Sequence, residues 1–232
     1  MNEHPSFQEC RSYVAAFAHS TPAPLSSAKK VPAAITISRQ TGARGRTIGT
    51  KLQNALRNQN PKAQVPWTLF DDNLVKKVLE DHNLPADLEK FMPDDAVGEI
   101  EGSINEILGR HPSLWSLFEK TVDTIVRLSR LGNCIIVGRG GNMITRGFSN
   151  VLHVRFIGTL EKRVQQMATA KHTSKKEAQQ YAKKEDAARK RYLKQHYHCD
   201  IDDPILYDLV INTDHLSDNE VVQILLAAIE AK

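Results

Sequence analysis

The chain has 232 residues, 41% hydrophobic and 25% charged, which is the balance of a globular protein with one sizeable core. Its formal net charge of +4 is too small to indicate a nucleic-acid-binding protein by itself. Three widely spaced cysteines exclude a disulfide framework and a CxxC zinc motif, and no apolar run is long enough to span a bilayer. We therefore expect a cytoplasmic protein without a membrane partner.

The first 32 residues are expected to form an appendage to the main domain at 33–232. It combines a short amphipathic helix with a Ser-, Pro- and Ala-rich linker. Charge is segregated within the main domain. Residues 71–106 carry eleven acidic and three basic side chains, whereas residues 162–194 carry eleven basic and three acidic ones. This asymmetry indicates a basic element that meets phosphates or an acidic partner.

Five short apolar runs predict β-strands, and segments with helical periodicity lie between them. The runs are Ala33–Ser38, Trp67–Phe70, Cys134–Gly138, Val151–Phe156 and Asp208–Asn212. Helices are expected over about 46–58, from 72 onward, over 114–131, 160–169 and 174–194, and after the capping box of Ser217 and Glu220. Alternating strands and helices predict an α/β protein in which helices cover both faces of a parallel sheet.

The turn after the first predicted strand has the pattern of a phosphate-binding loop. Residues 40–47, QTGARGRT, nearly match G-x-x-x-x-G-K-[ST], but Gln40 replaces the first glycine and Arg46 replaces the lysine. A strand that passes through a glycine turn into a helix presents N–H groups and a positive helix dipole to an anion. The expected phosphate cradle consists of Thr41, Gly42, Ala43, Arg44, Gly45, Arg46 and Thr47. The alternative is a glycine turn that only joins strand to helix.

Two further charged residues follow predicted strands, at the sheet edge where α/β proteins bind ligands. Arg139 follows the strand at 134–138, and a guanidinium suits bidentate contact with a phosphate. Its alternative role is a structural ion pair. Asp71 follows the strand at 67–70, where an aspartate is also common as a plain helix cap.

The chain resembles the cytidylate-kinase-like family of P-loop proteins, which are relatives of the nucleoside monophosphate kinases. The resemblance runs from about residue 34 to the C-terminus, and its pieces occur in matching order. They are ITISRQTGARGRTIG, LFDDNLV, CIIVGRGGNMI, VLHVRFIGTLEKRV, KKEDAARKRYLKQHY and YDLVINTDHLS. The resemblance implies a three-layer α/β/α fold with a five-stranded parallel sheet. It also implies an acidic helical insertion on the acceptor side, over 72–132, and a basic lid region over 171–200.

The resemblance further implies phosphoryl transfer with ATP and Mg²⁺ as cofactors. The expected catalytic residues are Arg46, Arg189 and Asp186, with the lid cations stabilising charge on the transferring group. Thr47 is placed to hold Mg²⁺ through its hydroxyl. Acceptor binding is expected at Asp71, Arg139 and Lys184.

A solvated helix is the alternative explanation of the basic region. The i,i+4 pairs Glu185–Arg189 and Asp186–Lys190 would stabilise such a helix unaided, and we assign Lys190 to its solvated face.

Two functional hypotheses from different classes follow from these residues. The first is a kinase that transfers the γ-phosphoryl group of ATP to a nucleoside monophosphate (CMP-like) or a related small phosphorylated acceptor. The second is a nucleotide- or phosphate-binding regulatory protein with weak or no catalysis, because Gln40 and Arg46 depart from the catalytic loop. A nucleic-acid partner has only the basic cluster in its favour, and scattered aromatics argue against it. The amphipathic helix near 112–131 is compatible with a homodimer.

Overall fold

The structure is a computed structural model that describes residues 31–71, 73–81 and 114–232. The expected N-terminal helix and most of the 72–132 insertion lie outside the described residues. Five parallel strands form one sheet in the order β2-β3-β1-β4-β5. They are β1 (Ala34–Arg39), β2 (Thr68–Phe70), β3 (Cys134–Val137), β4 (Val151–Ile157) and β5 (Leu209–Asn212). The predicted parallel sheet is therefore confirmed, with every strand end within one residue of its expected place.

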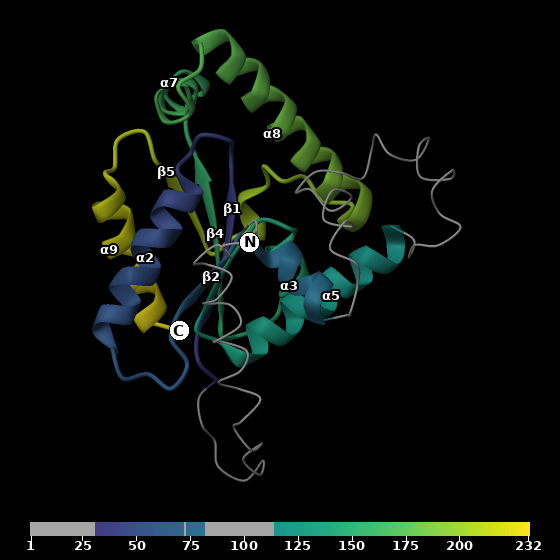
Figure 1. Ribbon diagram of the computed structural model, residues 1–232, viewed down its shortest axis with the longest axis vertical. Helices are drawn as coiled ribbons and strands as arrows, with labels where there is room; N and C mark the ends of the chain where they lie inside the picture. The colour runs from purple at the N-terminus through teal and green to yellow at the C-terminus, as the bar shows by residue number, and fades with distance from the viewer. Residues whose placement is uncertain (1–30, 72, 82–113) are drawn as a thin grey trace, which may run out of the picture.

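Helices cover both faces of the sheet, as predicted (Figure 1). On one face, α2 (Gly45–Gln59) and α9 (Asp218–Glu230) bury their apolar stripes in a cluster with Ile35 and Ile37 of β1. On the other face, α3 (Asn73–Asp81) and α5 (Leu114–Leu131) form a second cluster, to which Ala34 of β1 contributes. Successive β1 side chains thus alternate between two cores, because the side-chain period of a strand is two residues.

Two helices extend beyond the sheet, at the top of Figure 1. These are α7 (Leu160–Lys171) and α8 (Lys175–Tyr197), which share a small apolar cluster of Val164, Met167, Ala178 and Ala182. A capping box of Ser174 and Glu177 starts α8, which continues three residues past its expected end. Two short elements were not expected from the sequence, the helix α6 (Gly141–Ile144) and the 3-10 helix η2 (Pro204–Leu206). Within the described part of the chain, no helix has the length and apolarity that a membrane crossing needs.

The register of the sheet brings the carboxyl ends of its central strands together. Ile37 of β1 lies opposite Val137 of β3, and Arg39 of β1 lies opposite Phe156 of β4. Phe70 of β2 lies opposite Ile136, so Asp71 emerges at the same edge. The segments that follow β1, β2, β3 and β4 therefore converge on one end of the sheet, where open α/β sheets bind their ligands.

Candidate functional site

The 40–47 loop is fixed at its start by close contacts with the β4–α7 connection. Gly42 has φ +84°, and a Cβ on it would lie 2.5 Å from the carbonyl oxygen of Arg163. Gln40 donates its backbone N–H to the Phe156 carbonyl at 3.0 Å, and its side-chain Oε1 accepts from the Gly158 N–H at 3.0 Å. The residue that replaces the expected first glycine thus anchors the loop to its neighbour.

The other end of the loop opens into the first turn of α2. Ile48 donates to the Arg44 carbonyl at 2.9 Å and is the first residue of α2 to make a helical bond. The N–H groups before it belong to the helical turn that has no intrahelical acceptors. Arg46 and Thr47 are exposed in this turn. The arrangement provides backbone donors, a positive dipole and a cation in one place, which is the chemistry of a phosphate site.

Arg44, inside the loop, directs its side chain away from this turn. Its backbone is left-handed with φ 60°, and its guanidinium donates to Asp218 at 2.6 Å and to the carbonyls of Thr213 and Leu216. The Arg44 side chain therefore ties the loop to the segment before α9. Only the backbone of Arg44, and not its side chain, therefore remains at the expected phosphate cradle.

A carboxylate of α8, that of Asp186, holds the helix against the start of the 40–47 loop. Asp186 Oδ1 accepts from the Thr41 N–H at 2.7 Å and from Arg189 at 2.7 Å, while Oδ2 accepts from Arg163 at 2.8 Å. Arg189 also donates to the Thr41 hydroxyl, and Arg163 donates to the Thr41 carbonyl at 2.7 Å. Two of the expected catalytic residues, Asp186 and Arg189, are thus brought together beside the loop.

The hydrogen bonds around Asp186 decide its charge. Burial by itself would raise the pKa of this carboxyl group. The hydrogen bonds from the Thr41 N–H and from Arg189, together with the charge of Arg163, outweigh burial and lower the pKa below its ordinary value. Asp186 is therefore an anion at neutral pH, and it holds two guanidinium groups in fixed positions.

Asp71 is buried at the end of β2 and faces two arginines of the loop region. Its carboxylate lies 3.5 Å from Nε of Arg46 and 4.0 Å from Nη2 of Arg39. Asp71 also starts α3 through its carbonyl, which accepts from the Leu74 N–H at 3.0 Å. The structure thus connects an expected acceptor residue, Asp71, with the expected catalytic residue Arg46.

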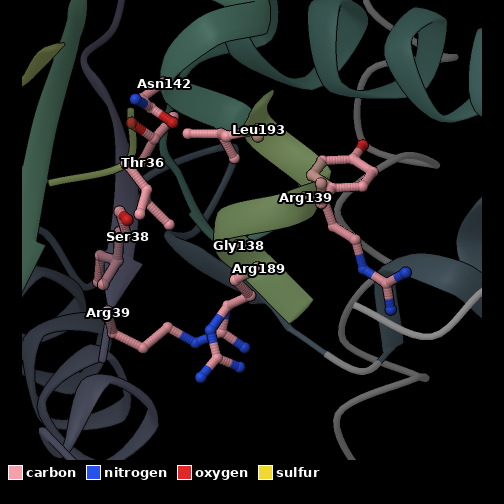
Figure 2. A pocket seen from close by; sticks show the side chains of 12 residues that line it. Thr36, Ser38, Arg39, Gly138, Arg139, Asn142, Arg189 and Leu193 are labelled. Atoms are coloured by element: carbon pink, nitrogen blue, oxygen red, sulfur yellow. The ribbon is translucent and has the colours of Figure 1, made fainter. Parts of the chain in front are cut away.

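Arg139 lines a cavity between the carboxyl ends of β1 and β3 and helix α8. The cavity is also lined by Arg39, Arg189 and Tyr192, and Figure 2 shows Arg39 and Arg189 directing their guanidinium groups into the same space. Arg139 itself has φ +57°. A left-handed backbone costs a non-glycine residue about 1–2 kcal/mol, so the fold holds Arg139 in this position against its preference.

A second cavity, of about 160 Å³, lies next to the first. Arg39 and Arg189 line both cavities, and Arg155 and Lys190 complete the basic lining of the second. Asp202 lies among these cations. Arg39 and Arg189 therefore lie between two cavities at the same end of the sheet.

Ion pairs join β4 and the C-terminal half of α8 to the segment that follows α8. The Arg155 side chain, 4% exposed, donates to Asp202 at 2.7 Å and to Ser38 at 2.9 Å. Lys190 lies 3.1 Å from Asp202 and 3.2 Å from Asp200. The expected pair between residues 186 and 190 was therefore wrong, because each partner has a nearer opposite charge elsewhere in the fold. The expected Glu185–Arg189 pair is present at 3.7 Å.

Aromatic rings cluster between α5 and the end of α8. Phe118 and His196 stack with centroids 4.5 Å apart, and Tyr192 lies 4.8 Å from His196. Burial lowers the pKa of His196, so the ring is neutral at physiological pH. Tyr197 contacts Gly140, where a Cβ would lie 2.9 Å from its ring. Of these rings, Tyr192 lines the Arg139 cavity.

Two functional candidates were missed by sequence reasoning, and one expected residue stands apart. Arg163 and Arg39 belong to the cluster; both lie in segments that carry the family resemblance, but neither was assigned a role there. The signal for Arg39 was its charge at the end of a central strand, next to the loop. Lys184 is exposed on α8, and the described structure records no partner for its side chain.

Comparisons with known proteins identify the family of the chain. Residues 34–215 match the cytidylate kinase-like family. A cytidylate kinase of Pyrobaculum aerophilum is 32% identical over 110 residues, which make up 47% of this chain and 59% of that enzyme. The match thus spans about three fifths of that relative's length.

One solved structure with low sequence identity shares the architecture. An uncharacterized protein from Eubacterium ventriosum has a TM-score of 0.62 at 17% identity, and the alignment covers 86% of this chain and 99% of that one. Shikimate kinase from Bacteroides thetaiotaomicron has a TM-score of 0.48 at 12% identity, with 85% and 98% covered. The former supports the fold alone. The family match includes all five strands, the 40–47 loop and α8, and the chain therefore belongs to the cytidylate kinase-like family.

Proposed function

We propose that the chain is a phosphotransferase that moves the γ-phosphoryl group of MgATP to a nucleoside monophosphate (CMP-like) or a related small phosphorylated acceptor. One observation carries the proposal. Arg189 contacts Thr41 in the phosphate loop and also lines the Arg139 cavity. A single guanidinium therefore lies between the loop and this cavity, and the cavity, at about 20 Å³, has to open before it admits an acceptor phosphate.

The residues present fit a nucleoside triphosphate together with its metal ion. The first turn of α2 and Arg46 form a donor set for polyphosphate, and the Thr47 hydroxyl lies in the same turn. Among the described residues, no group of three or more His, Cys, Asp or Glu side chains could hold a metal ion. This suits Mg²⁺, which is commonly held by phosphates together with one or two protein ligands. Thr47 is the protein ligand that we propose.

The chemistry asks the protein mainly for positioning and charge. With MgATP bound, an acceptor phosphate oxygen bonds to the γ-phosphorus while the bond to the β,γ-bridging oxygen breaks and leaves its electron pair on ADP. Arg189 and Arg46 neutralise the charge on the transferring group, and Arg139 holds the acceptor phosphate. Asp186 positions Arg189 through the 2.7 Å contact. Tyr192, which lines the cavity, offers an aromatic ring to a planar base.

The regulatory alternative has an observation of its own. The Asp186 carboxylate already accepts from the Thr41 N–H, and Arg46 already pairs with Asp71. A chain in which these contacts persist would bind nucleotide without transferring phosphate. Under this alternative a nucleotide stabilises the fold and stays intact.

A transfer assay separates the two functions. Labelled MgATP is incubated with a panel of ribo- and deoxynucleoside monophosphates, using wild type, Arg46→Ala and the exposed control Arg191→Ala. Thermal shift with each nucleotide reports binding. Transfer to one acceptor that is reduced in Arg46→Ala and kept in Arg191→Ala supports the kinase. A thermal shift with no transfer to any acceptor contradicts the kinase and supports the regulatory function.

A further inference from the structure

Arg163 is a charged residue that is buried at the start of α7. Its side chain is 8% exposed, whereas Glu161 and Lys162, just before it in the same helix, are exposed. Its backbone N–H donates to the Thr159 carbonyl at 3.1 Å, which places it at the end of the first turn of α7. A buried guanidinium destabilises a fold unless hydrogen bonds and opposite charge compensate for the water that it loses. The partners of Arg163 therefore indicate its role.

The Arg163 guanidinium joins three segments of the chain. Its Nε donates to the Gly158 carbonyl at 2.9 Å, in the β4–α7 connection. Its Nη1 donates both to the Thr41 carbonyl of the phosphate loop at 2.7 Å and to Oδ2 of Asp186 on α8 at 2.8 Å. The Arg163 backbone takes part as well, because its carbonyl oxygen is the atom that a Cβ on Gly42 would meet at 2.5 Å. One residue of α7 therefore contacts the loop and α8 at the same time.

Thr41 shows how these contacts combine, because its carbonyl, its N–H and its hydroxyl each have a partner. The carbonyl accepts from Arg163 at 2.7 Å, the N–H donates to Asp186 Oδ1 at 2.7 Å, and the hydroxyl accepts from Arg189. Asp186 closes the ring, since its Oδ2 accepts from Arg163 at 2.8 Å and its Oδ1 accepts from Arg189 at 2.7 Å. Arg189 therefore contacts the loop within a ring of hydrogen bonds that Arg163 completes.

Arg163 stands apart from the groups that could touch a ligand. Arg189 lines both of the cavities described above, but Arg163 lines neither of them. The plane of a guanidinium fixes the directions of its donors, so an arginine sets the orientation of a carboxylate that it binds. Without the Arg163 side chain, Asp186 would keep its bonds with Arg189 and with the Thr41 N–H but would lose its connection to α7.

We propose that Arg163 is a positioning residue, which places Arg189 beside the phosphate loop by fixing both Asp186 and the Thr41 carbonyl. Arg163 acts through these groups and does not touch the substrate. Its part in transfer rests on the proposed function, whereas its hold on the loop and on α8 can be measured without any ligand. A misplacement of about 1 Å at a reacting centre can lower a rate about 10²-fold, so the loss of this contact should be visible in kcat.

The first measurement is phosphate transfer from MgATP to the acceptor that the monophosphate panel identifies. The full chain is used as wild type, Arg163→Met, Arg163→Lys and the control Lys162→Met, which removes an exposed charge from the same turn. Arg163→Met should lower kcat at least about tenfold and leave each KM within about threefold of wild type. Arg163→Lys should recover part of the loss, and Lys162→Met should match wild type.

A double variant distinguishes positioning from an independent effect. Arg163→Met is compared in the wild-type background and in the Arg189→Met background. In the second background it should lower kcat less than about threefold, because a positioning residue has little effect once the group that it positions is gone.

The second measurement needs no substrate. Hydrogen exchange of the Thr41 amide, followed by NMR, reports the contact with Asp186, and exchange of the Ile135 amide in the buried strand β3 reports global unfolding. Arg163→Met should accelerate exchange at Thr41 at least about tenfold more than at Ile135.

Three results would overturn the inference. These are a wild-type kcat in Arg163→Met, an equal fold loss of kcat with and without the Arg189 side chain, and an equal increase in exchange at Thr41 and Ile135, which is the signature of a purely structural role. Failure of the proposed function looks different. In that case the wild type transfers phosphate to no acceptor, while Arg163→Met still accelerates exchange at Thr41 selectively. That result removes the role of Arg163 in transfer and supports its hold on the loop and on α8.

Discussion

The two flanks of the phosphate loop use arginine in opposite ways. Arg44 donates to two backbone carbonyls and to Asp218, all of which belong to the segment around the start of α9. Arg39 and Arg46 both lie near the carboxylate of Asp71 at the end of β2. An arginine whose donors end on fixed carbonyls is part of the fold. Under the proposed function, the arginines on the Asp71 side of the loop are the ones that meet phosphate.

Helix α8 shows the same contrast between its two faces. Arg189 and Asp186 face the loop and are partly buried, whereas Arg191 is exposed. The basic character of the helix is uniform in sequence, but a few of its charges contact the site. The proposed phosphate chemistry depends on those few residues.

The largest effect is expected for Arg189→Met. Removal of a donor that stabilises charge on a reacting group lowers kcat by about 10²–10³, and the neighbouring control Arg191→Met should stay within about twofold of wild type. The measurement is phosphate transfer from MgATP under saturating substrates. Equal losses in both variants would show that α8 acts through its overall charge and would remove the contrast between its faces.

Next in size is the effect of Gly42→Ala on stability. A left-handed φ penalises alanine at Gly42 and equally at Gly147, which has φ +94° and no atom within 4 Å of an added Cβ. Only Gly42→Ala also forces a Cβ to 2.5 Å from the Arg163 carbonyl. The free energy of unfolding should fall by about 1 kcal/mol for Gly147→Ala and by about 2–4 kcal/mol for Gly42→Ala. Equal losses in urea titrations would mean that the contact with Arg163 contributes nothing.

Arg44→Met tests whether Arg44 stabilises the fold. The change leaves two carbonyls without their donor and leaves the mostly buried Asp218 with Lys51 alone, so the free energy of unfolding should fall by about 2–3 kcal/mol. Lys51 pairs with the same Asp218 at 2.8 Å but has a side chain that is 46% exposed. Lys51→Met should therefore cost at most about 1 kcal/mol. A loss for Arg44→Met no larger than that for Lys51→Met would contradict the structural role of Arg44.

The smallest effect is the pH dependence of the α8 contact. The folded-state pKa of Asp186 is lowered from its ordinary 3.8, so its contribution to stability is present above that value and is lost as pH falls through the lower folded pKa. Wild type should be more stable than Asp186→Asn by a constant amount at neutral pH, and the two should converge in acid. Free energies of unfolding measured across the acid range test this. A difference that grows on acidification would contradict the direction of the pKa shift.

Much of the fold could be predicted because apolar patterning reports burial directly. The run Cys134–Val137 is buried at every position, as expected of a central strand. The helix α6 was missed because four residues, GNMI, contain too little periodicity to identify a helix. The sheet order depends on long-range pairing, and the resemblance implied only the number and direction of strands.

Less of the site could be predicted, because side-chain partners are tertiary. The 40–47 loop was visible as a motif, but the pattern assigned all its residues to one role. The structure turns Arg44 toward α9 and leaves Arg39, outside the motif, at the cavities. Local i,i+4 spacing predicted Lys190 as the partner of Asp186, but Arg163 of α7 takes that place. Sequence spacing within a helix gives no information on charges that another element supplies.

The most direct test of the account is a crystal structure of the chain with a non-hydrolysable MgATP analogue and CMP. The account predicts the terminal phosphate on the first turn of α2, within about 3 Å of the Arg189 guanidinium group. It also predicts the acceptor phosphate at Arg139, with Arg44 still bonded to Asp218. Phosphates bound elsewhere, or a terminal phosphate out of reach of Arg189, would contradict it.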